Sequence, residues 1–340
     1  MPELRQNPAT RDWVVIATER AKRPEQFTTG KSISQEALIE NEETCPFCLG
    51  NESKTPPEIL SYRPAGTEPN TPGWWLRIIP NMYPALVIDG KAQRRKIEDY
   101  FLSMNGIGNH EVLIESPNHS QTIATMEQRQ VEEIFLAYRE RYISLAKDPN
   151  FEMITIFRNH GINAGTSIRH PHSQIIAAPI VPQNIRQVVE EAMRYFDDKG
   201  TCVYCDMIAS EVKLKERVVS QSENFVVIQP FASRSPFETW VLPKEHGSTY
   251  DEISPEACKE LAFVMRTTLA KLYKGLNNPD YNYVIVSSPC HERKLEYYHW
   301  YIKIVPRISH AAGFELGSGI YINTVVPEEA AKFLSDIKVE

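Results

Sequence analysis

The chain has 340 residues and a formal net charge of −7 at pH 7, and 42% of the residues are apolar and 24% charged. This composition is typical of a globular protein with one or two domains. The acidic balance excludes a general nucleic-acid binder, because binding to the phosphate backbone needs excess Lys and Arg. No stretch approaches the roughly 18 apolar residues of a membrane span, and the start of the sequence does not resemble a signal peptide. We therefore expect a cytoplasmic protein with neither a nucleic-acid nor a membrane partner.

Two Cys-x-x-Cys pairs, at residues 45–48 and 202–205, each open a similar series of elements. Each pair is followed by a histidine, a run of apolar residues at helical spacing, a β-rich run and a second histidine that leads a strand. These elements lie at 119, 131–145, 153–157 and 170 in the first series, and at 246, 261–272, 283–287 and 299 in the second. The two histidines are 51 positions apart in the first series and 53 in the second. The order and the intervals therefore predict a duplicated α+β unit.

Each series carries two cysteines and two histidines, the ligand set of a tetrahedral zinc site. Six cysteines in a chain without an export signal fit a reducing compartment, where such pairs usually bind metal. A thioredoxin-like redox pair and buried free thiols are the alternatives, but neither pair has the βαβ setting of a redox pair. Four protein ligands leave no open position, so we expect two structural Zn²⁺ sites. Their ligands would be Cys45, Cys48, His119 and His170 in the first, and Cys202, Cys205, His246 and His299 in the second.

The segment from His170 to Gln174, His-Pro-His-Ser-Gln, is the most informative part of the chain. Alternate side chains of a strand point to the same face, so both histidines and the glutamine share one face. Such a row suits a phosphoryl group, because His172 can attack it while the Gln174 amide steadies its oxygens. The alternative is a surface strand with ordinary histidines. The second series has Tyr301 and Lys303 at the corresponding places, so only the first series can supply the nucleophile.

Together with Asn159-His-Gly161 and Gly165-Thr-Ser167, this segment resembles the galactose-1-phosphate uridylyltransferase family, the transferase branch of the histidine-triad superfamily. Further matching segments, spread over nearly the whole chain, are Arg5-x-Asn7-Pro8-x-Thr10-x-x-Trp13-Val14-Val15, Arg20-Ala-Lys-Arg23-Pro24, Cys45-Pro-Phe-Cys48-x-Gly50-Asn51, Arg77-Ile-Ile-Pro-Asn81, Pro236-Phe237-Glu238-Thr239 and Gly313-Phe314-Glu315. The resemblance implies an α+β fold of two tandem histidine-triad-like units, each an antiparallel sheet with a packed helix. We expect one unit at residues 1–190, with the nucleophile and the first zinc site, and the other at 191–340, with the second.

The resemblance implies a nucleotidyltransferase that works in two steps. His172 attacks the α-phosphorus of a nucleoside diphosphate hexose, and the hexose 1-phosphate leaves. A second hexose 1-phosphate then takes the nucleotide from the nucleotidyl-histidine. In the family, the donor is UDP-glucose and the acceptor is galactose 1-phosphate. The second nitrogen of His172 is expected to donate to the carbonyl of His170, and the Gln174 amide to hold a phosphoryl oxygen.

The resemblance also implies residues that bind these nucleotide sugar and sugar phosphate substrates. Those around the phosphates, base and ribose are Asn159, Gly165, Ser167, Phe47, Arg77 and Asn81. Those for the sugar or the acceptor are Arg20, Arg23, Phe314, Glu315 and Asn323. In the family, the positions of Arg20 and Arg23 reach toward the active site of the other subunit of a homodimer. If the resemblance is set aside, the alternative for Gly165 and Ser167 is a simple loop, and the alternative for the segment from Arg20 to Arg23 is a solvated basic stretch.

Two departures from the family leave the nucleotide and the acceptor open. Tyr301 and Lys303 stand where the best-known members carry metal-binding histidines, and Asn323 stands near the place of an expected glutamine. Both departures resemble ADP-glucose phosphorylase, which transfers an adenylyl group to inorganic phosphate, and this reaction is the alternative. A histidine-triad hydrolase would carry a further histidine in place of Gln174. A zinc-bearing scaffold without activity would leave His172 and Gln174 unexplained.

Overall fold

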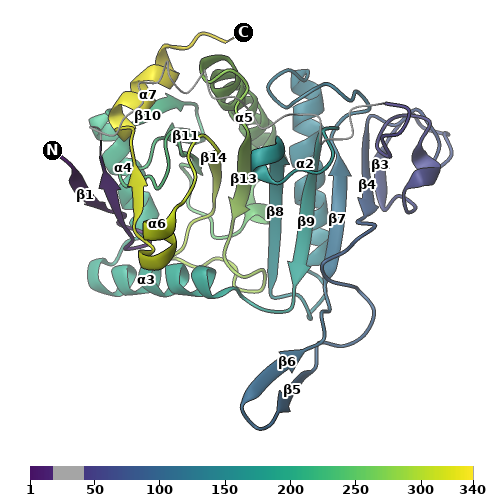
Figure 1. The fold of residues 1–340 in the computed structure, drawn as a ribbon, viewed down its shortest axis with the longest axis horizontal. Helices are drawn as coiled ribbons and strands as arrows, with labels where there is room; N and C mark the ends of the chain where they lie inside the picture. Colours follow the sequence, from purple (N-terminus) through teal and green to yellow (C-terminus); the bar gives the residue numbers. More distant parts are fainter. Residues whose placement is uncertain (18–41, 340) are drawn as a thin grey trace.

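The structure is a computed structural model that describes residues 1–17 and 42–339. Arg20 and Arg23 therefore lie outside the described residues. The elements, drawn in Figure 1, are β1 (Glu3–Gln6), β2 (Trp13–Ile16), β3 (Leu60–Tyr62), β4 (Leu76–Pro80), β5 (Arg94–Ile97), β6 (Phe101–Met104), β7 (Asn109–Ile114), α2 (Gln128–Leu145), β8 (Met153–His160), β9 (His172–Ala178), α3 (Gln183–Lys199), α4 (Val203–Leu214), β10 (Val218–Gln221), β11 (Phe225–Ile228), β12 (Thr239–Pro243), α5 (Pro255–Gly275), β13 (Tyr281–Val286), β14 (Tyr301–Pro306), α6 (Gly313–Ser318), β15 (Tyr321–Asn323) and α7 (Pro327–Asp336). Short 3₁₀ turns lie at Glu52–Lys54, Ile162–Ala164 and Tyr250–Glu252.

Ten strands form one sheet in the order β10-β11-β12-β14-β13-β8-β9-β7-β4-β3, and each neighbouring pair is antiparallel. The two halves repeat the same order, because β3, β4, β7, β9 and β8 correspond to β10, β11, β12, β14 and β13. The predicted α+β fold, with an antiparallel sheet in each half, is confirmed. The structure adds that the two five-stranded sheets join edge to edge, where β8 pairs with β13 (Figure 1).

Helices α2 and α5 pack against each other and cover one face of this sheet. The apolar residues of α2 that recur at helical spacing are all buried, namely Val131, Ile134, Phe135, Tyr138, Tyr142 and Leu145. Helix α5 begins at Pro255, and the hydroxyl of Ser254 accepts a hydrogen bond from the backbone N–H of Ala257. Burying each large apolar side chain contributes about 1.5–3 kcal/mol, so this shared core anchors both halves.

The alternation of side chains along β9 divides its residues between the core and the open face of the sheet. Ser173, Ile175 and Ala177 are buried, and the hydroxyl of Ser173 accepts from Tyr138 of α2 at 2.6 Å. His172 and Gln174 therefore lie on the opposite face, which no helix of the core covers. In register with them on β7 are Ile114 and Val112. The alternation of this segment thus puts the candidate reactive side chains on the open face of the sheet and Ser173 on the face that packs against the helices.

The N-terminal strands lie on the second half of the molecule. Strand β2 pairs antiparallel with β1 and parallel with β15, and this small sheet is separate from the large one. Arg5 of β1 donates to Glu328 of α7 at 2.9 Å and its guanidinium lies over the ring of Phe231. The division into units 1–190 and 191–340 stays a proposal, and its boundary falls inside α3.

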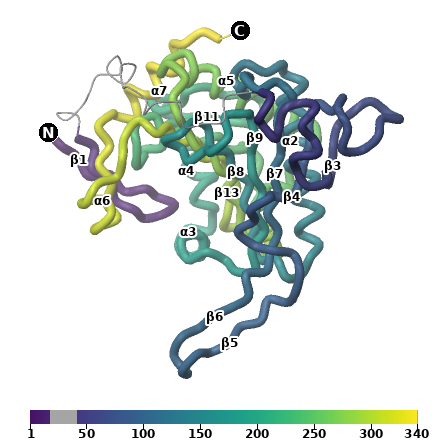
Figure 2. Tube along the Cα trace, turned by 45° about the vertical axis from the view of Figure 1, so that its right-hand side comes forward, coloured from purple at the N-terminus to yellow at the C-terminus, as the bar shows by residue number. Residues whose placement is uncertain are grey.

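A hairpin made by β5 and β6 projects from the body of the molecule (Figures 1 and 2). Its tip and the segment that leads to it expose large apolar side chains, namely Tyr83, Ile88, Ile97, Tyr100, Phe101 and Leu102. Among the helices of residues 1–17 and 42–339, none is both long and apolar enough to cross a membrane.

Candidate active site

His172 is the first residue of β9, and its ring is held by the backbone just before this strand. Its Nδ1 lies 2.8 Å from the carbonyl oxygen of His170, and a carbonyl only accepts, so Nδ1 carries the proton. The lone pair is therefore on Nε2. Burial lowers the pKa of His172 to about 4, the hydrogen bond to His170 opposes this shift, and the nearby Arg158 adds to it. At neutral pH the imidazole is thus uncharged, as a nucleophile must be.

Phe47, between the two cysteines of the first pair, packs its ring against both histidines of the segment. The centroid distances are 5.4 Å to His172 and 6.0 Å to His170. Its ring is nearly buried, at 7% exposed. The loop that carries the first pair of cysteines therefore lies against the nucleophile, which makes Phe47 a wall of the site.

The side-chain oxygen of Gln174 lies 2.7 Å from Nε2 of His110, a residue of β7. His110 was missed by the sequence analysis. The available signal was its alternation with Val112 and Ile114, which puts it on the same face as Gln174 once β7 is paired with β9.

The loop after β8 needs glycine at Gly161 and leaves Gly165 and Ser167 exposed. Gly161 has φ of +84°, and a Cβ there would lie 1.8 Å from the carboxylate of Asp280. That carboxylate accepts hydrogen bonds from both the backbone and the side chain of Asn163, which fixes the loop. Gly165 has φ of +86°, and open space surrounds the position of its missing Cβ.

A cavity of about 70 Å³ lies between this loop, the end of β8 and the start of β9. Asn159, Thr166 and His172 are among the residues that line it. The oxygen of the Asn159 amide accepts from Asn282 of β13 at 2.7 Å, which leaves the NH₂ group of Asn159 available. The structure therefore brings the predicted nucleophile and the predicted phosphate loop together.

Arg77 lies on β4 and Asn81 directly follows this strand, and the two side chains differ in what they can reach. The Arg77 guanidinium is 1% exposed and donates to Glu58 at 2.9 Å and to Thr55 at 2.8 Å. These hydrogen bonds connect β4 to residues 55–58, and the guanidinium is buried among them. The side-chain oxygen of Asn81 accepts from the N–H of Tyr83 at 2.8 Å, and its amide nitrogen lies beside His110.

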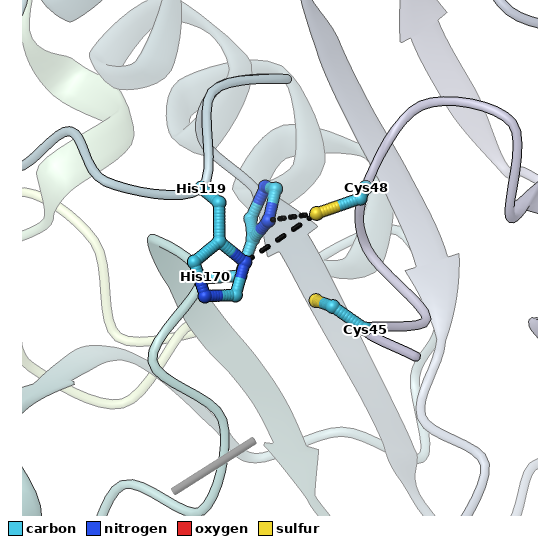
Figure 3. A group of neighbouring side chains, drawn as sticks. All are labelled: Cys45, Cys48, His119 and His170. Carbon is cyan, nitrogen blue, oxygen red and sulfur yellow. Dashed lines mark hydrogen bonds between the residues drawn. The ribbon is translucent and has the colours of Figure 1, made fainter. Parts of the chain in front are cut away.

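The four residues predicted as the first zinc site converge in the structure, as Figure 3 shows. Nδ1 of His119 and Nδ1 of His170 each lie 3.4 Å from Sγ of Cys48. Nε2 of His170 lies 2.6 Å from the carbonyl oxygen of Ser116, which leaves the lone pair on Nδ1, facing the thiols. Burial and the neighbouring Cys45 raise the pKa of the Cys48 thiol to about 12, so a thiolate there needs a cation beside it.

The second predicted set converges in the same way. Nδ1 of His246 and Nδ1 of His299 lie 3.3 Å and 3.7 Å from Sγ of Cys205. Nε2 of each ring is 2.9 Å from a backbone carbonyl oxygen, of Leu295 and Pro243 respectively. In both sets the four ligand atoms lie within 4.8 Å of one another. Ligands of tetrahedral zinc lie roughly 3.3–3.8 Å apart, so both sets fit such an ion after small shifts.

Helix α6, which carries Phe314 and Glu315, lies over the second half, away from β9 (Figure 1). A cavity of about 320 Å³ there includes Lys303, Glu315 and Tyr321 in its lining, and it shares no lining residue with the cavity beside His172. Phe314 is exposed. Asn323 is 1% exposed, and its amide donates to the backbone carbonyls of Ser233 and Ser235. The structure thus gives Asn323 a role in the fold, while its neighbour Tyr321 faces the cavity.

A histidine on an antiparallel sheet, two Cys₂His₂ sets and a duplicated five-stranded half define a histidine-triad-like fold of the transferase type. Two family models match in tandem: galactose-1-phosphate uridyl transferase, N-terminal domain, over residues 1–182, and galactose-1-phosphate uridyl transferase, C-terminal domain, over residues 188–335. The chain therefore belongs to the galactose-1-phosphate uridylyltransferase family, and it is a uridylyltransferase-like enzyme.

Relatives with two names are similar to this chain over its whole length. An ADP-glucose phosphorylase from Arabidopsis thaliana is 37% identical over 99% of this chain and 93% of its own. A galactose-1-phosphate uridylyltransferase from Thermotoga maritima is 30% identical over 100% of both chains. The crystal structure of an ADP-glucose phosphorylase from Arabidopsis thaliana with bound ADP-glucose has a TM-score of 0.83 and 35% identity, and covers 100% of both chains. A structure of uridylyltransferase has a TM-score of 0.75 and 26% identity over 98% of this chain and 97% of its own.

Proposed function

We propose that this chain moves a nucleoside monophosphate from a nucleoside diphosphate hexose to a hexose 1-phosphate, with UDP-glucose and galactose 1-phosphate as the substrate pair. The observation that carries the proposal is the hydrogen bond of 2.8 Å between Nδ1 of His172 and the carbonyl of His170. It fixes the tautomer in which Nε2 is a nucleophile, and burial keeps that ring uncharged.

The reaction consists of two displacements at the same phosphorus atom. In the first, the lone pair of Nε2 of His172 forms a bond to the α-phosphorus while the bond to the bridging oxygen breaks, and the hexose 1-phosphate leaves with that electron pair. In the second, a phosphate oxygen of the acceptor attacks the nucleotidyl-histidine and the P–N bond breaks, which returns the lone pair to Nε2. The amides of Gln174 and Asn159, with the loop at Gly165 and Ser167, stabilise the charge on the phosphoryl oxygens.

The positions of the other side chains support the remaining proposed roles. Phe47 forms one wall of the site and packs against the base, and the Asn81 amide contacts the nucleotide. Arg77 supports the nucleotide subsite indirectly, because its guanidinium is buried against Glu58. Zn²⁺ is the metal that the chemistry of both Cys₂His₂ sets suits. It would serve the fold, because His170 belongs to the first set and its backbone carbonyl holds the ring of His172, the first residue of β9.

A homodimer would explain why the two predicted parts of the site line separate cavities. Phe314 and Glu315 lie over the second half, and their cavity shares no residue with the one beside His172. A second subunit would bring its own Phe314 and Glu315, with Arg20 and Arg23, to the first subunit's nucleophile. The apolar hairpin of β5 and β6 supports this proposal, because an exposed apolar surface is typical of an interface. We further propose a cytoplasmic protein with no nucleic-acid partner.

Adenylyl transfer from ADP-glucose to inorganic phosphate is the second candidate function. It is favoured by the 37% identity to an ADP-glucose phosphorylase and by Lys303, which lines the cavity of the second half and can bind an anion. Both candidates use the same nucleotidyl-His172. They differ in the base that is bound and in the acceptor.

Labelling with donors that carry ³²P at the α-phosphorus tests the proposal and separates the candidates. The protein is incubated with UDP-glucose or ADP-glucose, denatured at alkaline pH and run on a gel. Label is expected on the wild type and none on His172→Gly, and the donor that labels faster identifies the base. A chase with galactose 1-phosphate or phosphate identifies the acceptor. The absence of label with both donors would reject the proposal.

A further inference from the structure

His110 lies beside the proposed phosphate-binding amide and belongs to none of the motifs of the chain. It is on β7, where Val112 pairs with Gln174, so His110 stands diagonally across from Gln174 on the same face. Its side chain is nearly buried, since the residue is 9% exposed. A nearly buried histidine next to a functional amide controls how that amide is turned, because both groups must satisfy each other's hydrogen bonds.

The backbone fixes which nitrogen of His110 carries the proton. The N–H of Ala85 lies 3.1 Å from Nδ1, and a backbone N–H can only donate. Nδ1 must therefore accept, and in the neutral ring the proton is on Nε2. Nε2 lies 2.7 Å from the side-chain oxygen of Gln174, and its N–H donates to that oxygen. The other end of the Gln174 amide, its NH₂ group, is then the end that faces a ligand.

The third neighbour of His110, Asn81, does not match this arrangement, because its NH₂ group and the N–H of Nε2 are both donors. The amide nitrogen of Asn81 lies 3.1 Å from Nε2, but the oxygen of the same amide is held by the N–H of Tyr83 at 2.8 Å. With the proton on Nε2, Asn81 cannot donate to the ring, so the assignment of the tautomer rests on the contacts with Ala85 and Gln174. In the opposite tautomer, the N–H of Nδ1 would face the donor N–H of Ala85, and the unprotonated Nε2 would face the acceptor oxygen of Gln174.

We propose that His110 is a positioning residue for nucleotidyl transfer, which holds the Gln174 amide with its NH₂ group toward the phosphoryl oxygens. This inference rests on the proposed function, since it concerns the same transfer. A glutamine without this partner can turn its oxygen to the phosphate, where two acceptors repel. His110 acts only through Gln174 and touches no reacting atom.

A double-mutant comparison of single-turnover labelling rates tests the proposal. His110→Phe keeps a ring of similar size and removes both hydrogen bonds, so the rate of His172 labelling should fall roughly tenfold or more, toward the roughly 10²–10³-fold loss of a missing donor. KM for the donor should change less than the rate. His110→Gln, which keeps a donor near Gln174, should recover part of the rate. His291→Phe makes the same replacement at an exposed histidine of the second half and should leave the rate unchanged.

Non-additivity distinguishes positioning from a structural role. If His110 acts through Gln174, the double variant His110→Phe/Gln174→Ala should be no slower than Gln174→Ala alone. Losses that multiply in the double variant would overturn the proposal.

The tautomer is measured independently of activity, by ¹H–¹⁵N spectra of ¹⁵N-histidine-labelled protein in which His110→Phe identifies the His110 signals. A proton on Nε2 is expected, and a proton on Nδ1 would overturn the proposal. If the wild type formed no nucleotidyl-His172, the proposed function would fail, and this spectrum would still decide whether His110 can donate to Gln174.

Discussion

Asn282 of the second half donates a hydrogen bond of 2.7 Å to the side-chain oxygen of Asn159 in the first half, across the strand pair that joins the two. The same NH₂ group reaches the carbonyl of Ala164 at 2.8 Å, and the oxygen of Asn282 accepts from Arg307 at 2.5 Å. Arg307 can only donate, so the orientation of Asn282 is fixed, and that of Asn159 follows from it. The half that lacks the nucleophile thus sets the direction of an amide beside the nucleophile.

Replacing Asn282 should slow nucleotidyl transfer without unfolding the protein. Asn282→Asp keeps the acceptor for Arg307 but loses the donor to Asn159. We expect the labelling rate to fall roughly 10-fold, which is less than the roughly 10²–10³-fold loss expected for Asn159→Ala itself. Rapid-quench labelling measures both rates. Equal rates in Asn282→Asp and wild type would show that Asn159 needs no partner from the second half.

The ion pair of Arg158 and Glu115 should be sensitive to the loss of one partner. The two side chains are 2% and 0% exposed and their closest atoms are 2.9 Å apart. Removing the cation in Arg158→Met leaves a buried carboxylate, for which we expect a loss of about 3–5 kcal/mol in the free energy of unfolding. The double variant Arg158→Met/Glu115→Gln should recover much of this loss. Urea unfolding of the three proteins gives the values, and an unchanged stability in Arg158→Met would refute the account of the pair.

Metal analysis should give two zinc ions per chain, one for each Cys₂His₂ set. Cys45→Ser and Cys202→Ser should each lose one ion and lower Tm by roughly 5–10 °C, because a structural metal stabilises only the folded state. Cys45→Ser should also abolish labelling of His172, since His170 is a ligand of the first set and its carbonyl holds the ring of His172. Cys202→Ser should lose less activity. A fully active preparation with no bound metal would contradict both assignments.

The hairpin of β5 and β6 should be needed for self-association. Phe101 and Leu102 are 60% and 65% exposed. Replacing both with serine removes apolar surface without touching the core, so we expect the proposed dimer to dissociate at micromolar concentration. Phe263→Ser, at a phenylalanine of α5 that is 54% exposed, is the matched control. Light scattering measures the mass, and a hairpin variant as dimeric as the control would show that the interface lies elsewhere.

The sequence predicted well those features that depend on spacing along the chain. Alternation in β9 put His172 and Gln174 on one face, and the repeated intervals correctly paired each Cys-x-x-Cys with two distant histidines, as the converging ligand atoms show. The residues of α2 predicted from helical spacing are all buried.

Features that depend on contacts between strands could not be predicted in this way. The union of the two sheets rests on the pairing of β8 with β13, for which one strand alone carries no signal. The same holds for His110, whose partner becomes visible only when β7 is aligned with β9. Arg77 and Asn323 were expected to bind substrates because of their places in motifs, yet each is 1% exposed and hydrogen-bonded inside the fold. A motif identifies a residue type at a position, but the direction of its side chain depends on the residues that surround it in the fold.

Isotope exchange without an acceptor tests the covalent nucleotidyl-His172 most directly. The protein is incubated with unlabelled UDP-glucose or ADP-glucose and with labelled glucose 1-phosphate, and the label that enters the nucleotide sugar is measured. If Nε2 of His172 takes the nucleotide, exchange should proceed at the rate of enzyme labelling in the wild type and be absent in His172→Gly. Net nucleotide transfer to an acceptor without any exchange would mean direct displacement between the two substrates, and would contradict the account.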